Sequence, residues 1–291
     1  MRFIIFAENE KAHRVHRFRQ EAKQRNIPFL LVNTSKMLIA EKHVFIDGEK
    51  EPLEITSDDT LWFVSNSKIN HYLIKRFSAV ASFVWPTAEM IDFADKFYGN
   101  SFFSSIGIPT PKTVLVNVNS LEMTERYLGK VPWVMKKNIS SGGEHVGLVH
   151  SREEMELFAG NVLSKKISKS LVPRGNRAFL LQEFIAESAG EDFRVICIGG
   201  KAVGCIKRSS NNDFRANVSL GGTPSACELD AEMVALSESI AEKGKLFYAG
   251  IDFIKGKHGY LAIEINTSAQ FEGFEAATGE NIAGKILDAL V

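Results

Sequence analysis

Two carboxylates and an amide could lie close together near the carboxyl end of the chain. Glu264 and Asn266 alternate with apolar residues, so at the period of a strand they share one face. If this strand and the preceding apolar run form a hairpin centred on His258, Asp252 lies directly opposite Glu264. Opposed carboxylates repel, and carboxylate and amide oxygens suit a hard cation such as Mg²⁺. The triple predicts a metal site, and a solvated strand face with incidental charges is the alternative.

A second group of residues could bind phosphate. Lys136 ends an apolar run in "WVMKKNISSGGEHVGLV" and is followed by Ser141, Gly142 and Gly143 before the next apolar run. Backbone N–H groups in such a loop can surround a phosphate, while the lysine supplies a point charge. The lysine precedes the glycines, so this is no Walker loop. By itself the loop is more often only a turn, but lysine, loop and downstream carboxylates in this order are more specific.

The elements that would position these residues differ between the two parts of the chain. Over about the first 90 residues strands alternate with helices, which favours an α/β unit with a parallel sheet. No G-x-G-x-x-G follows the first strand, so a dinucleotide fingerprint is not supported. The expected strands are 2–7, 28–33, 61–66 and 79–85, and the expected helices are 13–26 and one from Thr87 to Ile106.

Hairpins dominate the pattern from Pro132 onward, with helices expected from Arg152 and over 230–246. Gly199-Gly200 predicts a tight turn between two apolar strands. Regular pairing from that turn would place Asp192 opposite Lys207.

One segment, 164–177, is basic and has no clear period, so we expect a surface loop there, and it could help to cover the site.

Composition excludes several classes of protein. The chain has 291 residues, 45% hydrophobic and 24% charged, and its 35 Lys and Arg balance its 35 Asp and Glu. Bulk binding to nucleic acid or to an anionic membrane is therefore not expected. The three cysteines, Cys197, Cys205 and Cys227, form no C-x-x-C pair, which argues against a disulfide framework and a structural zinc and favours a reducing compartment. The apolar runs are too short for a signal peptide or a membrane span, so we expect a cytoplasmic protein.

Taken together, the motifs resemble the ATP-grasp superfamily and, within it, the RimK-type ribosomal-protein glutamate ligases. The resemblance covers about residues 90–291 and rests on "DKFYGNSFFSSIGIPTPKT", "VMKK…SSGG", "LLQEFIAESAGEDFRVICIGGKAVGCIKR", "DFRANVSLGG", "GIDFI" and "EINTSAQFEGFEAATGENIAGKI". It implies an α/β (α+β ATP-grasp) fold whose two antiparallel subdomains enclose ATP. The implied domains are a Rossmann-like N-terminal domain at 1–90, a central subdomain with the phosphate-covering loop at 91–182, and a C-terminal subdomain with the metal site at 183–291.

The resemblance also implies roles for individual residues. The implied nucleotide-binding residues are Lys96, Lys136, Ser141, Gly142 and Gly143 at the phosphates, Glu183, Phe184 and Ile185 at the adenine, and Asp192 at the ribose. The implied residues near the transferred phosphate and the substrate are Arg208, Arg215 and Asn217, and the implied metal ligands are Asp252, Glu264 and Asn266. Plainer alternatives are a cross-strand salt bridge for Asp192, an exposed helix lysine for Lys96 and an ordinary strand-end arginine for Arg208.

The implied activity is an ATP-dependent carboxylate–amine ligase that forms an amide through an acyl phosphate. It would join an amino acid, glutamate-like, to a peptide, protein or metabolite acceptor, using ATP and Mg²⁺, with two ions expected and Mn²⁺ as an alternative. No nucleic-acid or membrane partner is expected, and homo-oligomerisation is left open. Two rivals are another ligation on the same fold and a regulatory nucleotide-binding module without ligase activity.

Several positions depart from the family pattern. Ala269 and Gln270 replace a proline and a glycine after the metal-binding strand, and Ser140 replaces a glycine in the phosphate loop. Ser219 and Leu220 stand where the glutamate ligases tend to carry histidine and arginine. Nucleotide chemistry is therefore expected to be retained, while substrate specificity is expected to differ.

Overall fold

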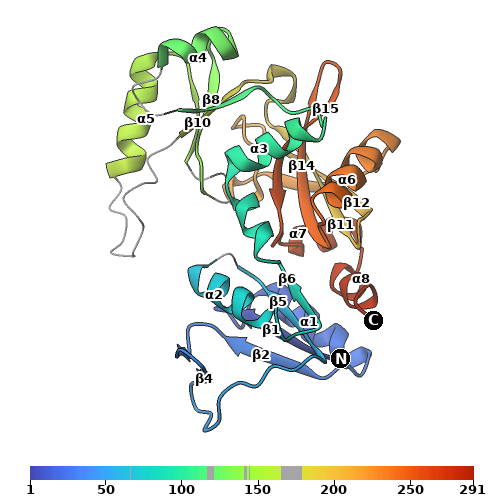
Figure 1. Ribbon diagram of the computed structural model, residues 1–291. Coiled ribbons are helices and arrows are strands. Elements are labelled where there is room, and N and C mark those ends of the chain that lie inside the picture. The colour runs from blue at the N-terminus through green and yellow to red at the C-terminus, as the bar shows by residue number, and fades with distance from the viewer. Residues whose placement is uncertain (66, 117–120, 141–142, 144, 165–178) are drawn as a thin grey trace.

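The N-terminal part of the computed structural model is a four-stranded parallel sheet. The structure describes residues 1–291 except 66, 117–120, 141–142, 144 and 165–178 (Figure 1). The strand order is β2-β1-β5-β6, formed by Phe29–Asn33, Arg2–Ala7, Asp59–Phe63 and Phe83–Trp85. The predicted α/β unit with a parallel sheet is confirmed. A short hairpin of β3 (Met37–Ile39) and β4 (Val44–Ile46) was not foreseen.

The two faces of this sheet follow the period of two in β1. Phe3 and Ile5 pack with α1 (His13–Gln24), whose buried apolar residues are Val15, Phe18 and Ala22. Ile4 and Phe6 belong to the cluster on the other face, with α2 (Lys68–Phe77). The sheet is thus covered on both sides, as a parallel sheet requires.

The central part is a four-stranded antiparallel sheet, in the order β7-β10-β8-β9. Its strands are Thr113–Val116, Phe179–Glu183, Trp133–Lys137 and Val146–Val149. Met155 and Ala159 of α5 (Arg152–Ser164) and Leu128 of α4 (Leu121–Leu128) bury their side chains in its core. The predicted 164–177 loop falls almost wholly on residues outside those the structure describes.

The C-terminal part is a five-stranded antiparallel sheet, in the order β13-β12-β11-β14-β15. Its strands are Thr223–Cys227, Lys201–Ser209, Glu191–Ile198, Tyr248–Gly256 and Gly259–Asn266, and its helices are α6 (Ala231–Lys243), α7 (Glu272–Thr278) and α8 (Ile282–Asp288). Gly199 and Gly200 form the predicted turn with φ of 58° and 79°, a conformation that glycine adopts without strain. The predicted fold class is confirmed.

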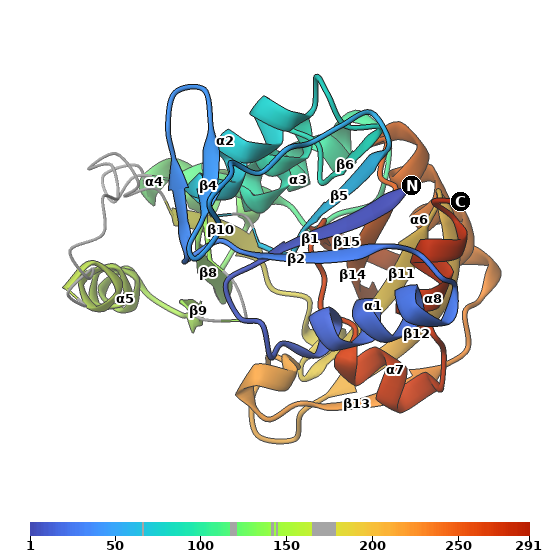
Figure 2. The same ribbon diagram turned by 90° about the horizontal axis from the view of Figure 1, so that it is seen from below.

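The first and last parts of the chain share one core. α8 packs beside α1, and Arg25 of the α1 end binds Asp288 with Nε–Oδ1 at 2.7 Å (Figure 2). Trp85 at the end of β6 donates its indole N–H to the carbonyl of Thr267 at 2.9 Å. The domain boundaries at 90 and 182 remain a proposal, and β10 runs one residue past the second of them.

The helix expected from Thr87 to Ile106 is wrong, because the chain breaks at Asp95. A 3₁₀ turn, η1 (Glu89–Ala94), precedes α3 (Lys96–Ser105), and Asp95 between them is extended at φ −83° and ψ 115°. The Asp95 carboxylate accepts the backbone N–H of Tyr98 at 2.8 Å, which caps α3. Asp95 also accepts the amide of Asn138 at 2.6 Å. The break makes Lys96 the first residue of α3 and ties it to the end of β8.

Two expectations from composition can be compared with the structure. Cys205 and Cys227 form a single disulfide, which was not predicted, and Cys197 is free and buried. Sequence spacing alone does not reveal that β12 and β13 place the two cysteines opposite each other. Among the described residues, no helix is long and apolar enough to cross a membrane.

Candidate functional site

A cavity lies between the central and C-terminal sheets and contains most of the predicted site residues. Its empty volume is about 830 Å³, including the part open to solvent. The predicted residues that line it are Lys96, Lys136, Gly143, Glu183, Phe184, Ile185, Asp192, Arg208, Arg215, Asn217, Asp252 and Glu264. Asn266 is not among the lining residues, and Ser141 and Gly142 fall outside the described residues.

Asp252 lies opposite Glu264, as predicted, but the strand register that produces this pairing is not the regular one that was expected. The turn pairs Gly256 with Gly259, which by regular pairing would place Asp252 opposite Ile263. An irregularity between Asp252 and Phe253 shifts the register by one residue, and Asp252 then lies opposite Glu264. The bulge therefore brings the two carboxylates together at the cavity.

The predicted partner of Asp192 is wrong for a similar reason. A bulge between Ile196 and Cys197 shifts the hairpin, so Asp192 lies opposite Arg208 instead of Lys207. Asp192 accepts a hydrogen bond from the Nε of Arg208, and both residues are buried. Burial raises the pKa of Asp192, although the charge of Arg208 opposes that rise. Lys207 instead binds Glu191 at 2.6 Å.

Arg194 is a site residue that the sequence analysis missed. It donates Nε and Nη2 to the two carboxylate oxygens of Asp252, each at 2.6 Å. Arg208 adds a third bond to Asp252 at 3.0 Å. Burial alone would raise the pKa of Asp252, but the two guanidinium groups outweigh burial and lower it. The available signal was the spacing, because Arg194 is two residues from Asp192 on the same strand face.

The two predicted phosphate lysines both point into the cavity region. Lys136 donates to the side-chain oxygen of Gln182 at 2.8 Å, and burial lowers its pKa to about 8, partly offset by Glu264. Lys96 donates to the carbonyl of Ser140 at 2.6 Å and lies 3.3 Å from Glu264 Oε1. Its side chain is only 10% exposed, so it is not an ordinary surface lysine. The break at Asp95 explains this placement.

The hairpin of β8 and β9 carries the predicted phosphate loop and is called the phosphate-loop hairpin below. It contacts the segment 214–217. Arg215 donates Nη1 to the carbonyls of Gly143 and Val146 at 3.1 and 3.0 Å. A Cβ at Gly143, where φ is +73°, would lie 2.5 Å from Asn217 Oδ1. The positive φ favours glycine here, and Gly143 lies against the segment that carries Arg215 and Asn217, all of which line the cavity.

Apolar residues also line the cavity. Phe184 and Ile185 lie there with Val134 and Ile254. Glu183 is held just before them, because its backbone N–H and its carboxylate both bond the backbone of Lys112, at 2.9 and 3.0 Å. The cavity lining thus combines apolar side chains with many charged ones.

The predicted metal ligands provide oxygen donors of the right kind. Among the described residues, no three His, Cys, Asp or Glu gather into a metal site, so the donor set is two carboxylates and an amide. Glu264 is 29% exposed and bonds Lys96, and Asn266 buries an amide nitrogen with no partner among the described residues. To bind a metal ion, Asp252 would give up one of its hydrogen bonds from arginine. These donors fit Mg²⁺. Arginines already balance the charge of Asp252, so the closeness of Asp252 and Glu264 does not by itself require a metal ion.

Comparison with known proteins identifies the family of the chain. The model of the RimK-like ATP-grasp domain matches residues 93–290. A "Probable alpha-L-glutamate ligase" of Legionella pneumophila (strain Corby) is 34% identical over 198 residues, which are 67% of this chain and 62% of the relative. A protein of the same name from Coxiella burnetii (strain Dugway 5J108-111) is 26% identical over 299 residues, which cover 99% of this chain and 94% of the relative.

Solved structures show the same fold. The macrocyclase MdnC bound with precursor peptide MdnA, from Microcystis aeruginosa MRC, has a TM-score of 0.74 at 14% identity and covers 100% of this chain and 99% of its own. A RimK domain protein ATP-grasp from Sphaerobacter thermophilus has a TM-score of 0.73 at 17% identity, with 99% of both chains covered. Together with the family match over 93–290, these findings show that the chain belongs to the RimK-like ATP-grasp family.

Proposed function

We propose that the chain is an ATP-dependent carboxylate–amine ligase that forms an amide bond through an acyl phosphate. One observation carries the proposal: a single cavity is lined both by apolar residues, among them Phe184 and Ile185, and by lysines, arginines and carboxylates. ATP has matching parts, a flat base and a charged polyphosphate. Family membership supports the same substrate.

The cavity residues would stabilise charge rather than attack the substrate. Lys96 and Lys136 would contact phosphate oxygens, and Arg208 would lie near the transferred phosphoryl group. A substrate carboxylate would take the γ-phosphoryl group, releasing ADP, and an amine would then displace phosphate from the acyl phosphate. Such transfer depends mainly on positioning and on electrostatic stabilisation. Bound by Glu264, Asp252 and Asn266, Mg²⁺ would neutralise part of the phosphate charge.

The acyl phosphate would need protection from water. The contacts of Arg215 with the carbonyls of Gly143 and Val146 join the phosphate-loop hairpin to the opposite wall. The close approach of Gly143 to Asn217 leaves no room for a larger side chain between them. We propose that these contacts limit hydrolysis of the intermediate.

The substrates would be an amino acid and a peptide, protein or metabolite acceptor. Two of the relatives are named as probable alpha-L-glutamate ligases, and one neighbour is a macrocyclase bound with a precursor peptide. The segment where the sequence departs from the family contacts the N-terminal part of the chain: Trp85 binds the carbonyl of Thr267, and Arg14 binds that of Ser268 at 2.8 Å. We propose that substrate choice is set along this contact.

ADP release tests the proposal. The purified chain is incubated with ATP and Mg²⁺ and with pooled amino acids and peptides, and the products are identified by mass spectrometry. ADP formation that depends on both an amine and a carboxylate, with a product of the summed mass less water, is the expected result. ATP binding without ADP formation across the whole panel would contradict it and would favour the regulatory module.

A further inference from the structure

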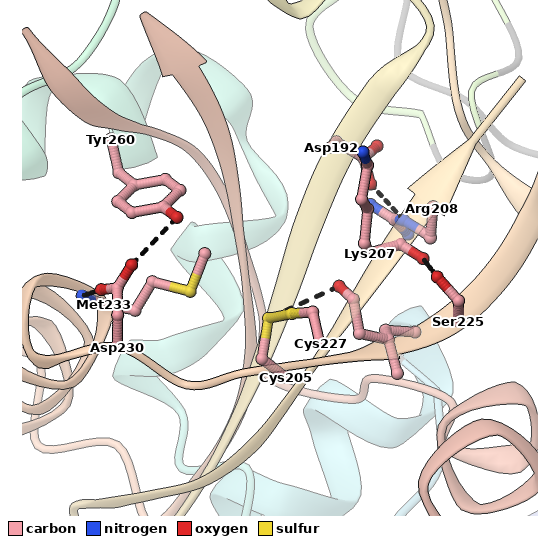
Figure 3. Close-up of a disulfide and its surroundings, with 10 residues drawn as sticks. Asp192, Cys205, Lys207, Arg208, Ser225, Cys227, Asp230, Met233 and Tyr260 are labelled. Atoms are coloured by element: carbon pink, nitrogen blue, oxygen red, sulfur yellow. Dashed lines mark hydrogen bonds and ion pairs between the residues drawn. A yellow bond between two sulfur atoms is a disulfide. The ribbon is translucent and has the colours of Figure 1, made fainter.

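The disulfide between Cys205 and Cys227 closes a loop that contains one wall of the cavity. The cysteines lie opposite each other on β12 and β13, with their Cα atoms 5.5 Å apart and 22 positions apart in sequence (Figure 3). Between them are Arg208 and the segment 214–217, all of which line the cavity. Every cavity residue contributed by β12 and by the connection to β13 is therefore inside this covalent loop.

β13 is hydrogen-bonded to another strand on one side only, and α7 also contacts it. It is the edge strand of its sheet, and Thr223, Ser225 and Ala226 are exposed. Pro224, opposite Arg208, has no backbone N–H to donate to the ladder. The side chain of Ser225 reaches the carbonyl of Lys207 at a long 3.4 Å (Figure 3). An exposed five-residue edge strand is a weak anchor, so the covalent link matters for its position.

The order of this loop is linked to the phosphate-binding hairpin. The guanidinium group of Arg215 spans from Asp213, at 2.6 Å, to the carbonyls of Gly143 and Val146. Its donors are thus shared between the disulfide-closed loop and the opposite wall. If β13 separates from β12, the connection between them gains conformational freedom. Forming the bonds of Arg215 to Gly143 and Val146 then costs additional conformational entropy.

The bond is open to thiol exchange from one side. Cys227 is half-buried, whereas Cys205 is only 2% exposed. A glutathione thiolate would attack the sulfur of Cys227, and the Cys205 thiolate would leave and take a proton. A second glutathione would then attack the mixed disulfide and release the Cys227 thiol and glutathione disulfide. Two electrons and two protons pass from two glutathione molecules to the protein disulfide, and the oxidation reverses these steps.

We propose that Cys205 and Cys227 are a reversible thiol–disulfide modification site that controls nucleotide binding. In the disulfide form the 210–222 connection is ordered before the nucleotide arrives. In the dithiol form part of the binding energy is used to order it, so affinity falls. The inference rests on the proposed nucleotide site, and it adds a control that the family assignment does not contain.

The test compares the full chain in oxidised and reduced glutathione buffers. Mass spectrometry records the cysteine state, calorimetry records the Kd for ADP with Mg²⁺, and hydrogen exchange without nucleotide records the order of 210–222. We expect faster exchange in this segment after reduction and a Kd roughly tenfold weaker. Cys227→Ser should bind ADP as the reduced chain does in both buffers.

Cys197 provides the matched control. It is buried on β11, and burial raises the pKa of its thiol to about 12, so it is a poor partner for exchange. Cys197→Ser should keep the full redox response. Equal Kd values in the two buffers would overturn the inference, as would failure of the disulfide to form in oxidised buffer. If neither form binds ADP, the nucleotide site is wrong, while hydrogen exchange still shows whether the disulfide orders the wall.

Discussion

Asp252 and Glu264 lie directly opposite each other on β14 and β15, and a bulge rather than the turn places them there. The two carboxylates are not equivalent. Asp252 is 2% exposed and binds two arginines, whereas Glu264 is 29% exposed and binds Lys96. Glu264 would therefore be the carboxylate more available to a metal ion, whereas the charge of Asp252 is already balanced by two arginines.

Glu264→Gln should abolish most ligase turnover with little effect on folding. The substitution keeps the size of the side chain and removes the charge that would bind Mg²⁺, so ADP formation should fall by about 10² or more. Steady-state ADP release and the thermal unfolding midpoint check both expectations. Glu238→Gln, at a surface glutamate that binds Lys201 at 3.0 Å, is the matched control and should keep full activity. Near-normal turnover by Glu264→Gln would show that Glu264 is not a ligand.

Arg194→Ala should destabilise the fold. Asp252 would keep only Arg208 as a buried partner, and removing one member of a buried ion pair typically costs about 3 kcal/mol of unfolding free energy. Denaturant unfolding followed by circular dichroism measures the change. Arg152→Ala removes an exposed i,i+4 pair with Glu156 and should cost only about 0.3–0.5 kcal/mol. Equal effects of the two substitutions would contradict the network described for Asp252.

Nucleotide affinity should fall as pH rises through about 8. The pKa of Lys136 is lowered to about 8 by burial, so the ammonium group that would contact phosphate is lost above that pH. Calorimetric titration with ADP between pH 6.5 and 9.5 measures this. Lys136→Arg stays charged over this range and should show a flatter profile. A wild-type profile as flat as that of the arginine variant would contradict the assignment of Lys136.

The lowered pKa of Lys136 also predicts that the stability of the fold depends on pH. Between about 8 and the usual lysine value of 10.5, the unfolded chain binds more protons at Lys136 than the folded chain does. Stability at this group therefore rises with pH across that window. Lys136→Met removes the titratable group. The difference in unfolding free energy between this variant and the wild type should therefore change with pH. A constant difference would show that the Lys136 pKa is not lowered.

Gly143→Ala should weaken nucleotide binding. An added Cβ would meet Asn217 Oδ1 at 2.5 Å and push the phosphate-loop hairpin from the opposite wall. Gly107→Ala is the control for backbone strain. Gly107 has nearly the same φ, +74°, but a Cβ added there would have no atom within 4 Å. Both variants should lose stability through backbone strain, and only Gly143→Ala should raise the Kd for ADP. Equal Kd values would show that the close approach does not shape the site.

The sequence predicted the fold class and twelve of the residues that line the cavity, but not most of their partners. Period-two patterns identify strand faces, and the order of motifs identified residues that meet only in three dimensions. Register was not predictable in the same way, because one bulged residue changes each pairing beyond it. This is why Asp192 faces Arg208 and not Lys207.

Two further features were missed for physical reasons. The break at Asp95 depends on Asn138, 43 positions away, and a local helical pattern does not reveal a capping partner so distant in sequence. Arg194 lies in a plain strand pattern, and its importance comes from Asp252 on the neighbouring strand. Both are tertiary contacts that follow from how the sheets and helices pack.

The most direct measurement follows the oxygen atoms of the carboxylate substrate. Once the panel has identified the substrates, the carboxylate is labelled with ¹⁸O and the released phosphate is analysed by mass spectrometry. An acyl phosphate requires one labelled oxygen to pass from the carboxylate to the phosphate for each amide formed, together with one ADP. Phosphate that carries no label, or release of AMP in place of ADP, would contradict the proposed ligase mechanism.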